Sequence, residues 1–462
     1  MTEQRGNWTS SAGFILAATG SAIGLGNLWK FPFITWENNG GAFVLVYLLC
    51  IAAVGLPIMM AELLIGRKTQ KSAVGALKEA VGPAWGIVGG WGVLCGFILL
   101  SYYTVIAGWS LFYFGRTMEW TLMGFPEGLQ TGDLFGAQVS NAGLQLTLSL
   151  VFSAATVAVV YFGVQKGIER IARTFLPILF GILLLLLVSA LGMSGSGEAL
   201  GFIFRPSFSE LEPNGVLEAL GHSFFTLSLG MGAMITYGSY IDRNQSIVKA
   251  SAVIVVLDTL VALAATVIMF SVIFSVAGME EQVGGSTVGM LFISLPQLFY
   301  TEVPFGSLLG PLFYVLVALA ALTSTMSLLE VVASYVIDEH GIDRHRATLM
   351  CGGGVFLFTI LAALSFTDAP FLSTLTLFEG KTGWFSTADH FVSNWMLPTG
   401  GFAITLAAGW FMTREATAGE LGDDTAPGWF KYGLWRFFIR YVSPLAVGAI
   451  IIAVFFFGVD FS

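Results

Sequence analysis

The chain has 462 residues, of which 56% are hydrophobic and only 11% are charged, and its net charge is −9. Soluble domains carry about 25% charged residues, so this composition excludes a water-soluble enzyme, a disordered chain and a nucleic-acid-binding protein. A mean hydropathy of +0.81 predicts instead a membrane protein with many spans. The three cysteines, Cys50, Cys95 and Cys351, lie in apolar runs without CxxC spacing, so they indicate neither disulfides nor a metal site.

Apolar stretches long enough to cross a bilayer recur along the whole chain. A hydrocarbon core of about 30 Å needs about 20 helical residues. We therefore expect an all-α polytopic membrane protein with 11 transmembrane helices, at roughly residues 12–36, 42–66, 86–114, 143–163, 174–193, 216–240, 248–277, 307–337, 347–366, 388–412 and 435–458. The first stretch lacks the cleavage site of a signal peptide, so we expect it to stay in the mature protein.

The lysines and arginines are distributed unequally between the two sets of loops. With these spans, 16 of the 20 fall on one side, Lys30 falls inside the first span, and only Arg116, Arg205 and Lys381 fall on the other side. Cytoplasmic loops are enriched in basic residues. The amino terminus is therefore expected in the cytoplasm and the carboxyl terminus outside, in a multi-pass protein of the plasma (inner) membrane.

Two spans are interrupted by glycines near their middle, between Gly20 and Asn27 and between Ser228 and Gly232. Each is the first helix of a five-span block, and an odd number of spans inverts the second block relative to the first. Glycine-interrupted helices in matching positions are the best sequence pointer to the central binding site of a transporter. On either span alone, small residues spaced by four also simply let helices pack closely.

These breaks divide the chain into two inverted repeats of five helices each. We expect a cytoplasmic amino-terminal segment at 1–11, the first repeat (helices 1–5) at 12–193, an extracellular loop at 194–215, the second repeat (helices 6–10) at 216–412, a cytoplasmic loop at 413–434, and helix 11 with a short external tail at 435–462.

Polar groups inside the spans are candidates for ligand binding. Unwound backbone in a membrane leaves amides and carbonyls that need partners. The two ends of a helix favour ions of opposite sign, so two breaks suit a zwitterion and sodium.

Asp258 has no basic residue within one helical turn, so its partner must be a metal ion or a group on another helix, with a distant lysine as the alternative. Asn27 and Thr226 offer neutral oxygens suited to a hard cation. His222 is more often a satisfied core histidine than a proton carrier. The remaining intramembrane carboxylates are Glu62, Glu330 and Asp389.

Several runs of sequence, in order from about residue 5 to 412, resemble the neurotransmitter:sodium symporter family. They are Arg5, Trp8 and GSAIGLGNLWKFP (Gly20 to Pro32) for the first helix, HSFFTLSLGMGAMITYGSY (His222 to Tyr240) for the sixth, and the runs that begin at Asp258, Leu322 and Ala388 for the seventh, eighth and tenth. Eleven spans resemble many bacterial members, among them the bacterial leucine and hydrophobic amino acid transporters.

The resemblance implies two sodium sites, a substrate pocket and two gates. The first sodium site would use Ala22, Asn27, Thr226 and Asp258; the second would use Gly20, Ile23, Ala320, Thr323 and Ser324. The substrate pocket would be lined by Ser21, Ala22, Gly24, Gly26, Leu99, Tyr103, Phe225, Thr226, Ser228, Met231, Ser324 and Leu328. The inner gate would pair Arg5 with Asp338, assisted by Trp8 and Tyr240, and the outer gate would pair Lys30 with Asp389, with Phe225 as lid.

Departures from the family pattern refine this expectation. Gly24 stands where monoamine transporters carry an aspartate, so the substrate should bring its own carboxylate, and the side-chain pocket is apolar. In the chloride site of animal members, Tyr47 remains, but His222, Asp258 and Ala262 replace other polar residues. Because Asp258 can supply the negative charge, we expect no chloride requirement. Lys30 stands where arginine is usual and lacks the bidentate guanidinium, so the outer gate is hypothesised to open more easily.

We therefore expect a sodium-coupled symporter of neutral hydrophobic or aromatic L-amino acids that works by alternating access. The sequence has no HExxH, no GxSxG and no paired catalytic aspartates, so an enzyme is not expected. A proton-coupled amino-acid permease of similar fold and a non-transporting amino-acid sensor are the alternatives. The expected partners are the amino acid, Na⁺ and the lipid bilayer, with no nucleic acid. The sequence leaves open the preferred amino acid, the sodium stoichiometry, proton antiport, the role of His222 and the oligomeric state.

Overall fold

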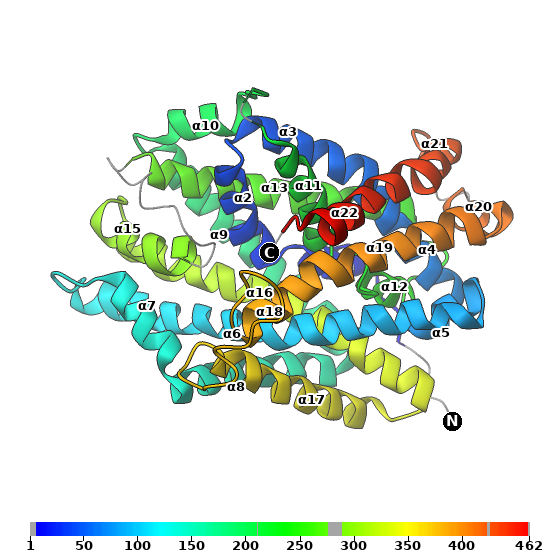
Figure 1. Ribbon diagram of the computed structural model, residues 1–462, viewed down its shortest axis with the longest axis horizontal. Helices are drawn as coiled ribbons and strands as arrows, with labels where there is room; N and C mark the ends of the chain where they lie inside the picture. Colours follow the sequence, from blue (N-terminus) through cyan, green and yellow to red (C-terminus); the bar gives the residue numbers. More distant parts are fainter. Residues whose placement is uncertain (1–5, 210, 276–288, 423–425, 461–462) are drawn as a thin grey trace.

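The computed structural model describes residues 6–209, 211–275, 289–422 and 426–460. Over this part the chain is all-helical, apart from one isolated antiparallel bridge between Phe378 and Lys381. Most of the long helices run roughly along the longest axis of the molecule (Figure 1). The expectation of an all-α membrane fold is confirmed.

The helices of the first half begin with a helix broken near its middle. They are α1 (Ser11–Ala22), η1 (Gly26–Lys30), α2 (Phe31–Glu37), α3 (Gly41–Cys50), η2 (Ile51–Gly55), α4 (Leu56–Thr69), α5 (Ala73–Ala80), η3 (Pro83–Trp85), α6 (Gly86–Met123), α7 (Thr131–Ser140), α8 (Ala142–Tyr161), η4 (Val164–Glu169), α9 (Arg170–Leu191) and α10 (Ser196–Phe204).

The second half begins with another broken helix. Its helices are α11 (Pro213–Thr226), α12 (Ala233–Gly238), α13 (Ile247–Ile273), η5 (Met290–Ser294), α15 (Leu295–Thr301), α16 (Gly306–His340), α17 (Arg344–Leu364), α18 (Trp384–His390), η6 (Phe391–Met396), α19 (Leu397–Leu406), η7 (Ala407–Phe411), α20 (Arg414–Leu421), α21 (Tyr432–Phe437), η8 (Phe438–Val442) and α22 (Ser443–Phe457).

Helices that are long and apolar enough to cross a membrane agree with most of the predicted spans. In the described part there are eight, and a ninth if α1 and the η1–α2 segment, bent by 50°, count as one span. The predicted spans 216–240 and 388–412 correspond to α11 with α12 and to the run from α18 to η7. The total of eleven spans stays a prediction.

Both predicted breaks are present, and their backbone explains the glycines. Helix α1 ends at Ala22, and Ile23 is extended, with φ −69° and ψ 106°. Between α11 and α12, Gly230 and Gly232 have φ of 81° and 76°, in the left-handed region that favours glycine. A Cβ on Gly230 would lie 2.5 Å from the carbonyl oxygen of Leu397, so no larger residue fits this turn.

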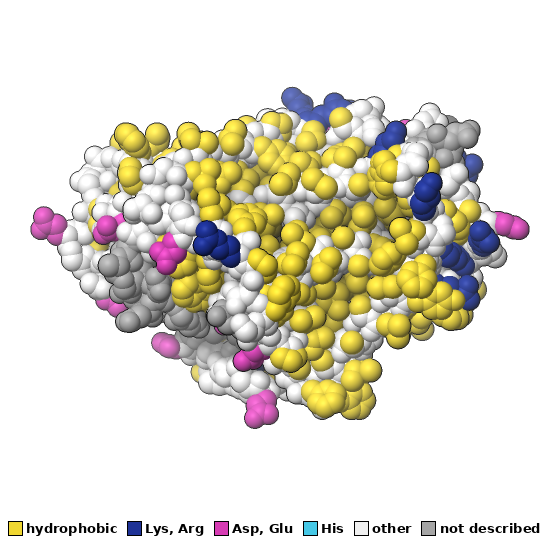
Figure 2. Space-filling model, turned by 90° about the horizontal axis from the view of Figure 1, so that it is seen from above, with side chains coloured by type: hydrophobic (Ala, Val, Ile, Leu, Met, Phe, Trp, Pro, Cys, Tyr) yellow, Lys and Arg dark blue, Asp and Glu magenta, His cyan; other side chains and the backbone are white. Residues whose placement is uncertain are grey.

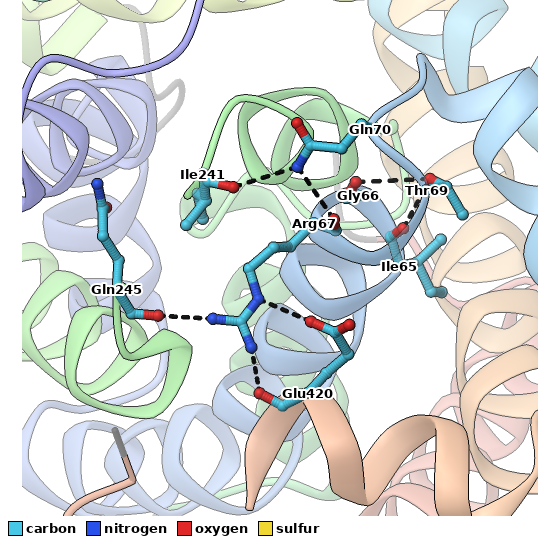
Figure 3. A network of polar contacts seen from close by, with 8 residues as sticks. All are labelled: Ile65, Gly66, Arg67, Thr69, Gln70, Ile241, Gln245 and Glu420. Atoms are coloured by element: carbon cyan, nitrogen blue, oxygen red, sulfur yellow. Dashed lines mark hydrogen bonds and ion pairs between the residues drawn. The ribbon is translucent and has the colours of Figure 1, made fainter. Parts of the chain in front are cut away.

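Two predicted loops contain helices. The extracellular loop expected at 194–215 holds α10, and the cytoplasmic loop expected at 413–434 holds α20. Arg67, at the end of α4, has a side chain only 1% exposed, and its Nε lies 2.8 Å from Glu420 of α20. The same guanidinium donates to the carbonyl oxygens of Glu420 and of Gln245, the latter at 2.6 Å (Figure 3). The ion pair joins α20 to α4, and the hydrogen bond to Gln245 joins α4 to the segment that follows α12. The bounds of the two connecting loops stay a prediction.

On the face that Figure 2 shows, the charged side chains lie mainly at the two ends. Figure 2 shows most lysine and arginine side chains at one end, most acidic side chains at the other, and a broad hydrophobic surface between them. Helices α5, α20 and α21 lie at the end with the lysines and arginines, which we call the basic end (Figure 1). A hydrophobic belt between two polar ends is the surface that a bilayer covers.

Candidate functional site

A central cavity lies where the two helix breaks meet α6 and α16, and it holds about 340 Å³ of space between its atoms. All twelve residues of the predicted substrate pocket line it: Ser21, Ala22, Gly24, Gly26, Leu99, Tyr103, Phe225, Thr226, Ser228, Met231, Ser324 and Leu328. These residues come from helices far apart in the sequence, and the fold brings them together. Their role in binding a substrate stays a prediction.

One end of the cavity is polar because unwound backbone and hydroxyl groups meet there. The Tyr103 hydroxyl accepts a hydrogen bond of 2.9 Å from the amide of Leu25, so its own proton is free to donate elsewhere. A Cβ on Gly24 would lie 2.6 Å from Ser324 Oγ and 2.8 Å from the Tyr103 hydroxyl oxygen. A side chain at position 24 would therefore have to displace one of these two hydroxyl groups.

Asp258 of α13 lies beside the break in the first span, and its side chain is fully buried. The amide of Asn27 donates to its Oδ1 at 2.8 Å, and the Thr226 hydroxyl lies 3.1 Å from both carboxylate oxygens. No ion pair to Asp258 exists among the described residues, so the alternative of a distant lysine is not realised there. Two neutral donors compensate a buried carboxylate only in part. The residues of the predicted first sodium site thus fit a cation.

The predicted second sodium site lies between α1 and α16, which approach closely. A Cβ on Gly20 would lie 3.0 Å from the Cβ of Thr323. Thr323 donates back to the carbonyl of Ala320 at 2.9 Å, the common habit of a helical threonine, whereas Ser324 reaches across to the carbonyl of Ile23 at 3.4 Å. The predicted ligands are hydroxyl and carbonyl oxygens alone, a donor set suited to a monovalent hard cation.

Phe225, the predicted lid, lines both the central cavity and a second cavity, which Lys30 and Asp389 also line. The ammonium of Lys30 lies 5.2 Å from the centre of the Phe225 ring. Asp389 accepts a hydrogen bond of 2.9 Å from the Tyr102 hydroxyl, and in the described part of the chain no ion pair joins it to Lys30. The predicted ion pair of the outer gate is therefore not formed between these described residues, and the role of the gate stays a prediction.

The predicted inner gate is described only in part, because Arg5 lies outside the described residues. Trp8 is 2% exposed, and its indole donates to the carbonyl of Tyr237 at 3.0 Å. Its ring meets that of Tyr240 edge-on at 6.2 Å. Asp338 accepts a hydrogen bond of 2.6 Å from the amide of Ser72. Trp8 therefore packs the amino-terminal segment against α12, the helix that follows the second break.

Two intramembrane carboxylates have partners that sequence reasoning did not assign. Glu62 accepts a hydrogen bond of 2.7 Å from the amide of Gly230 and so anchors the unwound segment. Glu330 is fully buried, pairs in bidentate fashion with Arg344 at 2.8 and 2.9 Å, and accepts from the Tyr240 hydroxyl at 2.6 Å. Their burial inside spans is the signal by which sequence can find them.

His222 does not behave as the satisfied core histidine that was expected. It is 3% exposed, and neither ring nitrogen has a hydrogen-bond partner among the described residues. Its ring stacks on Phe31 at 5.6 Å and lies 5.8 Å from Tyr47. It also lines a side cavity of about 290 Å³ together with Lys30. His222 therefore lies beside a cavity, and both of its ring nitrogens are buried.

Comparison with known proteins agrees with this architecture. The family profile described as "Sodium:neurotransmitter symporter family" matches residues 5–124 and 135–459. An uncharacterized sodium-dependent transporter of Bacillus subtilis (strain 168), YhdH, is 38% identical over 449 residues, which are 97% of this chain and 97% of that protein. The sodium-dependent neutral amino acid transporter B(0)AT2 of Bos taurus is 29% identical over 303 residues, 59% of this chain and 41% of that protein.

A solved structure has the same fold. The crystal structure of MhsT in complex with L-phenylalanine matches with a TM-score of 0.88 and 37% identity, and the match covers 98% of this chain and 100% of that one. The resemblance drawn from the sequence motifs is thereby confirmed. Because the family profile and YhdH each cover most of its length, the chain belongs to the sodium:neurotransmitter symporter family and is a sodium-dependent membrane transporter, not an enzyme.

Proposed function

We propose that the chain is a symporter of neutral hydrophobic or aromatic L-amino acids, driven by sodium at two sites and independent of chloride. The observation that carries this proposal is the buried carboxylate of Asp258, which has only neutral hydrogen-bond donors around it and lies beside the central cavity. A sodium ion bound there supplies the missing positive charge.

The shape of the cavity supports an amino acid as substrate. Gly24 supplies no side-chain counter-ion for an amine, so a substrate with its own carboxylate is favoured, held by the Tyr103 hydroxyl and by sodium at the first site. Leu99, Met231 and Leu328 give the cavity apolar walls, and a charged side chain would lose its hydration there without a partner. The L-phenylalanine bound to MhsT and the neutral amino acids named for B(0)AT2 agree with this class of substrate.

Chloride independence follows from the charge of Asp258. A chloride ion near the first sodium site would lie beside a second negative charge, and such a like-charge pair is unfavourable in a buried site. The charge pattern of the surface supports the orientation proposed here, with the amino terminus in the cytoplasm, the carboxyl terminus outside, and the basic end at the cytoplasmic face of the plasma membrane (Figure 2).

The transport cycle proposed here alternates the two gates around the fixed central site. Trp8 closes the inner side while Phe225 and the pair of Lys30 and Asp389 are open to the outside. Sodium and the amino acid then bind together at the first site, so that each raises the affinity of the other. Closure of the lid is followed by release of sodium from the second site, which frees the inner half of the first span and opens the inner gate.

Binding of radiolabelled L-phenylalanine, L-leucine and L-tryptophan to purified protein tests the proposal. We expect binding that rises steeply with sodium and is unchanged when gluconate replaces chloride. Binding that ignores sodium but responds to pH would favour the proton-coupled permease. Sodium-dependent binding without flux in proteoliposomes would favour a sensor.

A further inference from the structure

Two arginines near the contact between η7 and η8, Arg436 of α21 and Arg440 of η8, have no acidic partner among the described residues. Arg436 donates to the carbonyl oxygen of Ala408 at 3.3 Å and to the hydroxyl of Thr417 at 3.0 Å, and both acceptors are neutral. The guanidinium of Arg440 lies 4.3 Å from the centre of the Trp410 ring, and its Nε is buried with no hydrogen-bond partner. Neither arginine forms an ion pair with a described residue, so no described acidic group neutralises these two positive charges, which lie one helical turn apart.

The surface around Arg440 is held in place by backbone contacts. A Cβ on Gly409 would lie 2.9 Å from the carbonyl oxygen of Ile439 and 3.1 Å from the Cα of Arg440, so η7 and η8 touch at this glycine. The indole of Trp410 donates to the carbonyl oxygen of Arg440 at 2.9 Å. The aromatic face and the guanidinium above it are therefore fixed relative to each other.

Exposed apolar side chains continue from these arginines along one helix face. Phe437, Tyr441 and Leu445 recur every four residues and are 52%, 44% and 74% exposed, and Trp410 beside them is 51% exposed. Helices α20 and α21 place this surface toward the basic end (Figure 1). Tryptophan and tyrosine concentrate where the bilayer meets water, so the arginines lie at the level of the headgroups and the apolar face runs toward the acyl chains.

We propose that this surface, formed by Trp410, Arg436, Phe437, Arg440, Tyr441 and Leu445, binds one anionic phospholipid. The phosphate accepts hydrogen bonds from the guanidinium of Arg440, whose planar fork matches phosphate oxygens, and Arg436 adds a second positive charge. An acyl chain lies along Phe437, Tyr441 and Leu445.

Charge and shape favour a lipid over the other possible occupants. A second copy of this chain, related by a twofold axis through this face, would bring its own Arg440 toward this one, because such an interface is self-complementary. A soluble anion would satisfy the charge but leave the apolar face uncovered. Only a ligand with an anionic head and a hydrocarbon tail matches both parts of the surface.

Native mass spectrometry of the purified full-length protein, titrated with phosphatidylglycerol or phosphatidylcholine, tests the proposal. We expect one tightly bound phosphatidylglycerol, with at least fivefold weaker binding of phosphatidylcholine. The Arg440→Gln variant should weaken phosphatidylglycerol binding at least fivefold, and Arg440→Lys should lie between. The matched control is Arg346→Gln, which changes an exposed arginine that is predicted on the same side of the membrane and has no ion pair among the described residues.

Sodium-dependent amino-acid binding in each variant verifies that the protein is folded. Unchanged phosphatidylglycerol binding in Arg440→Gln would overturn the proposal. An equal loss in Arg346→Gln would also overturn it, by showing a general effect of surface charge. Equal occupancy by inorganic phosphate, or a change in subunit number in Arg440→Gln, would assign the surface to a soluble anion or to a second copy instead.

Discussion

The Gly24→Ala substitution tests the geometry of the central cavity with a single methyl group. The added Cβ would lie 2.6 Å from Ser324 Oγ and 2.8 Å from the Tyr103 hydroxyl oxygen, whereas ordinary contacts begin at 3.4 Å. The nearer group must therefore move by 0.8 Å, the difference between 3.4 and 2.6 Å. Both groups line the cavity, so their displacement disturbs the site and not the rest of the fold.

Overpacking of this kind costs about 1–3 kcal/mol. If the cost appears in the bound state, the affinity for substrate falls by about 5- to 140-fold, because 1.4 kcal/mol is a factor of ten. The assay is equilibrium binding of L-phenylalanine at saturating sodium, with the melting temperature of the substrate-free protein measured alongside.

The matched control for this substitution is Gly96→Ala on α6. Its Cβ would lie 3.8 Å from Val331 Cγ1 and 3.9 Å from Leu328 Cδ2, which are ordinary contacts. This variant should bind L-phenylalanine like the wild type. A dissociation constant within twofold of wild type in Gly24→Ala would refute the proposed crowding of the cavity.

Three further predictions concern the first sodium site, the outer gate and the contacts of α20. Asp258→Ala removes the proposed sodium ligand and should reduce sodium-dependent binding at least tenfold; near-normal sodium affinity in equilibrium titrations would contradict its role. Lys30→Arg gives Asp389 a bidentate partner and should shift the outer gate toward closure. An unchanged outward-open population in single-molecule or spin-label distance measurements would contradict this hypothesis. Arg67→Gln breaks a buried ion pair, a loss that costs about 3–5 kcal/mol, and should lower the melting temperature by several degrees. The control Lys71→Gln breaks a half-exposed ion pair and should leave the melting temperature unchanged. Equal melting temperatures for the two variants would count against a structural role for α20.

Most of the spans could be predicted because the membrane imposes one rule on every helix. A spanning segment must be apolar and long, so stretches such as 248–277 and 307–337 coincide closely with α13 and α16. The two breaks could also be predicted, from a different pattern. Glycines and other small residues cluster in two spans at matching positions of the two halves, and Gly230 in the second cluster has a φ of 81°.

Features that depend on distant partners could not be predicted from local patterns. Helix α20 is short and polar, and its anchor is Arg67, separated from Glu420 by 353 positions. The unpaired nitrogens of His222 likewise follow from which side chains surround it in the fold, including Phe31 and Tyr47. The sequence indicated polar groups inside the membrane, and only the packing of helices determines which of them find partners.

Uptake of L-phenylalanine into proteoliposomes with an inward sodium gradient tests the central claim most directly. The account predicts accumulation that requires the sodium gradient, persists when gluconate replaces chloride, and is lost in Asp258→Ala. Accumulation driven by a pH gradient in the absence of sodium, or undiminished uptake by Asp258→Ala, would contradict sodium-coupled symport at this site.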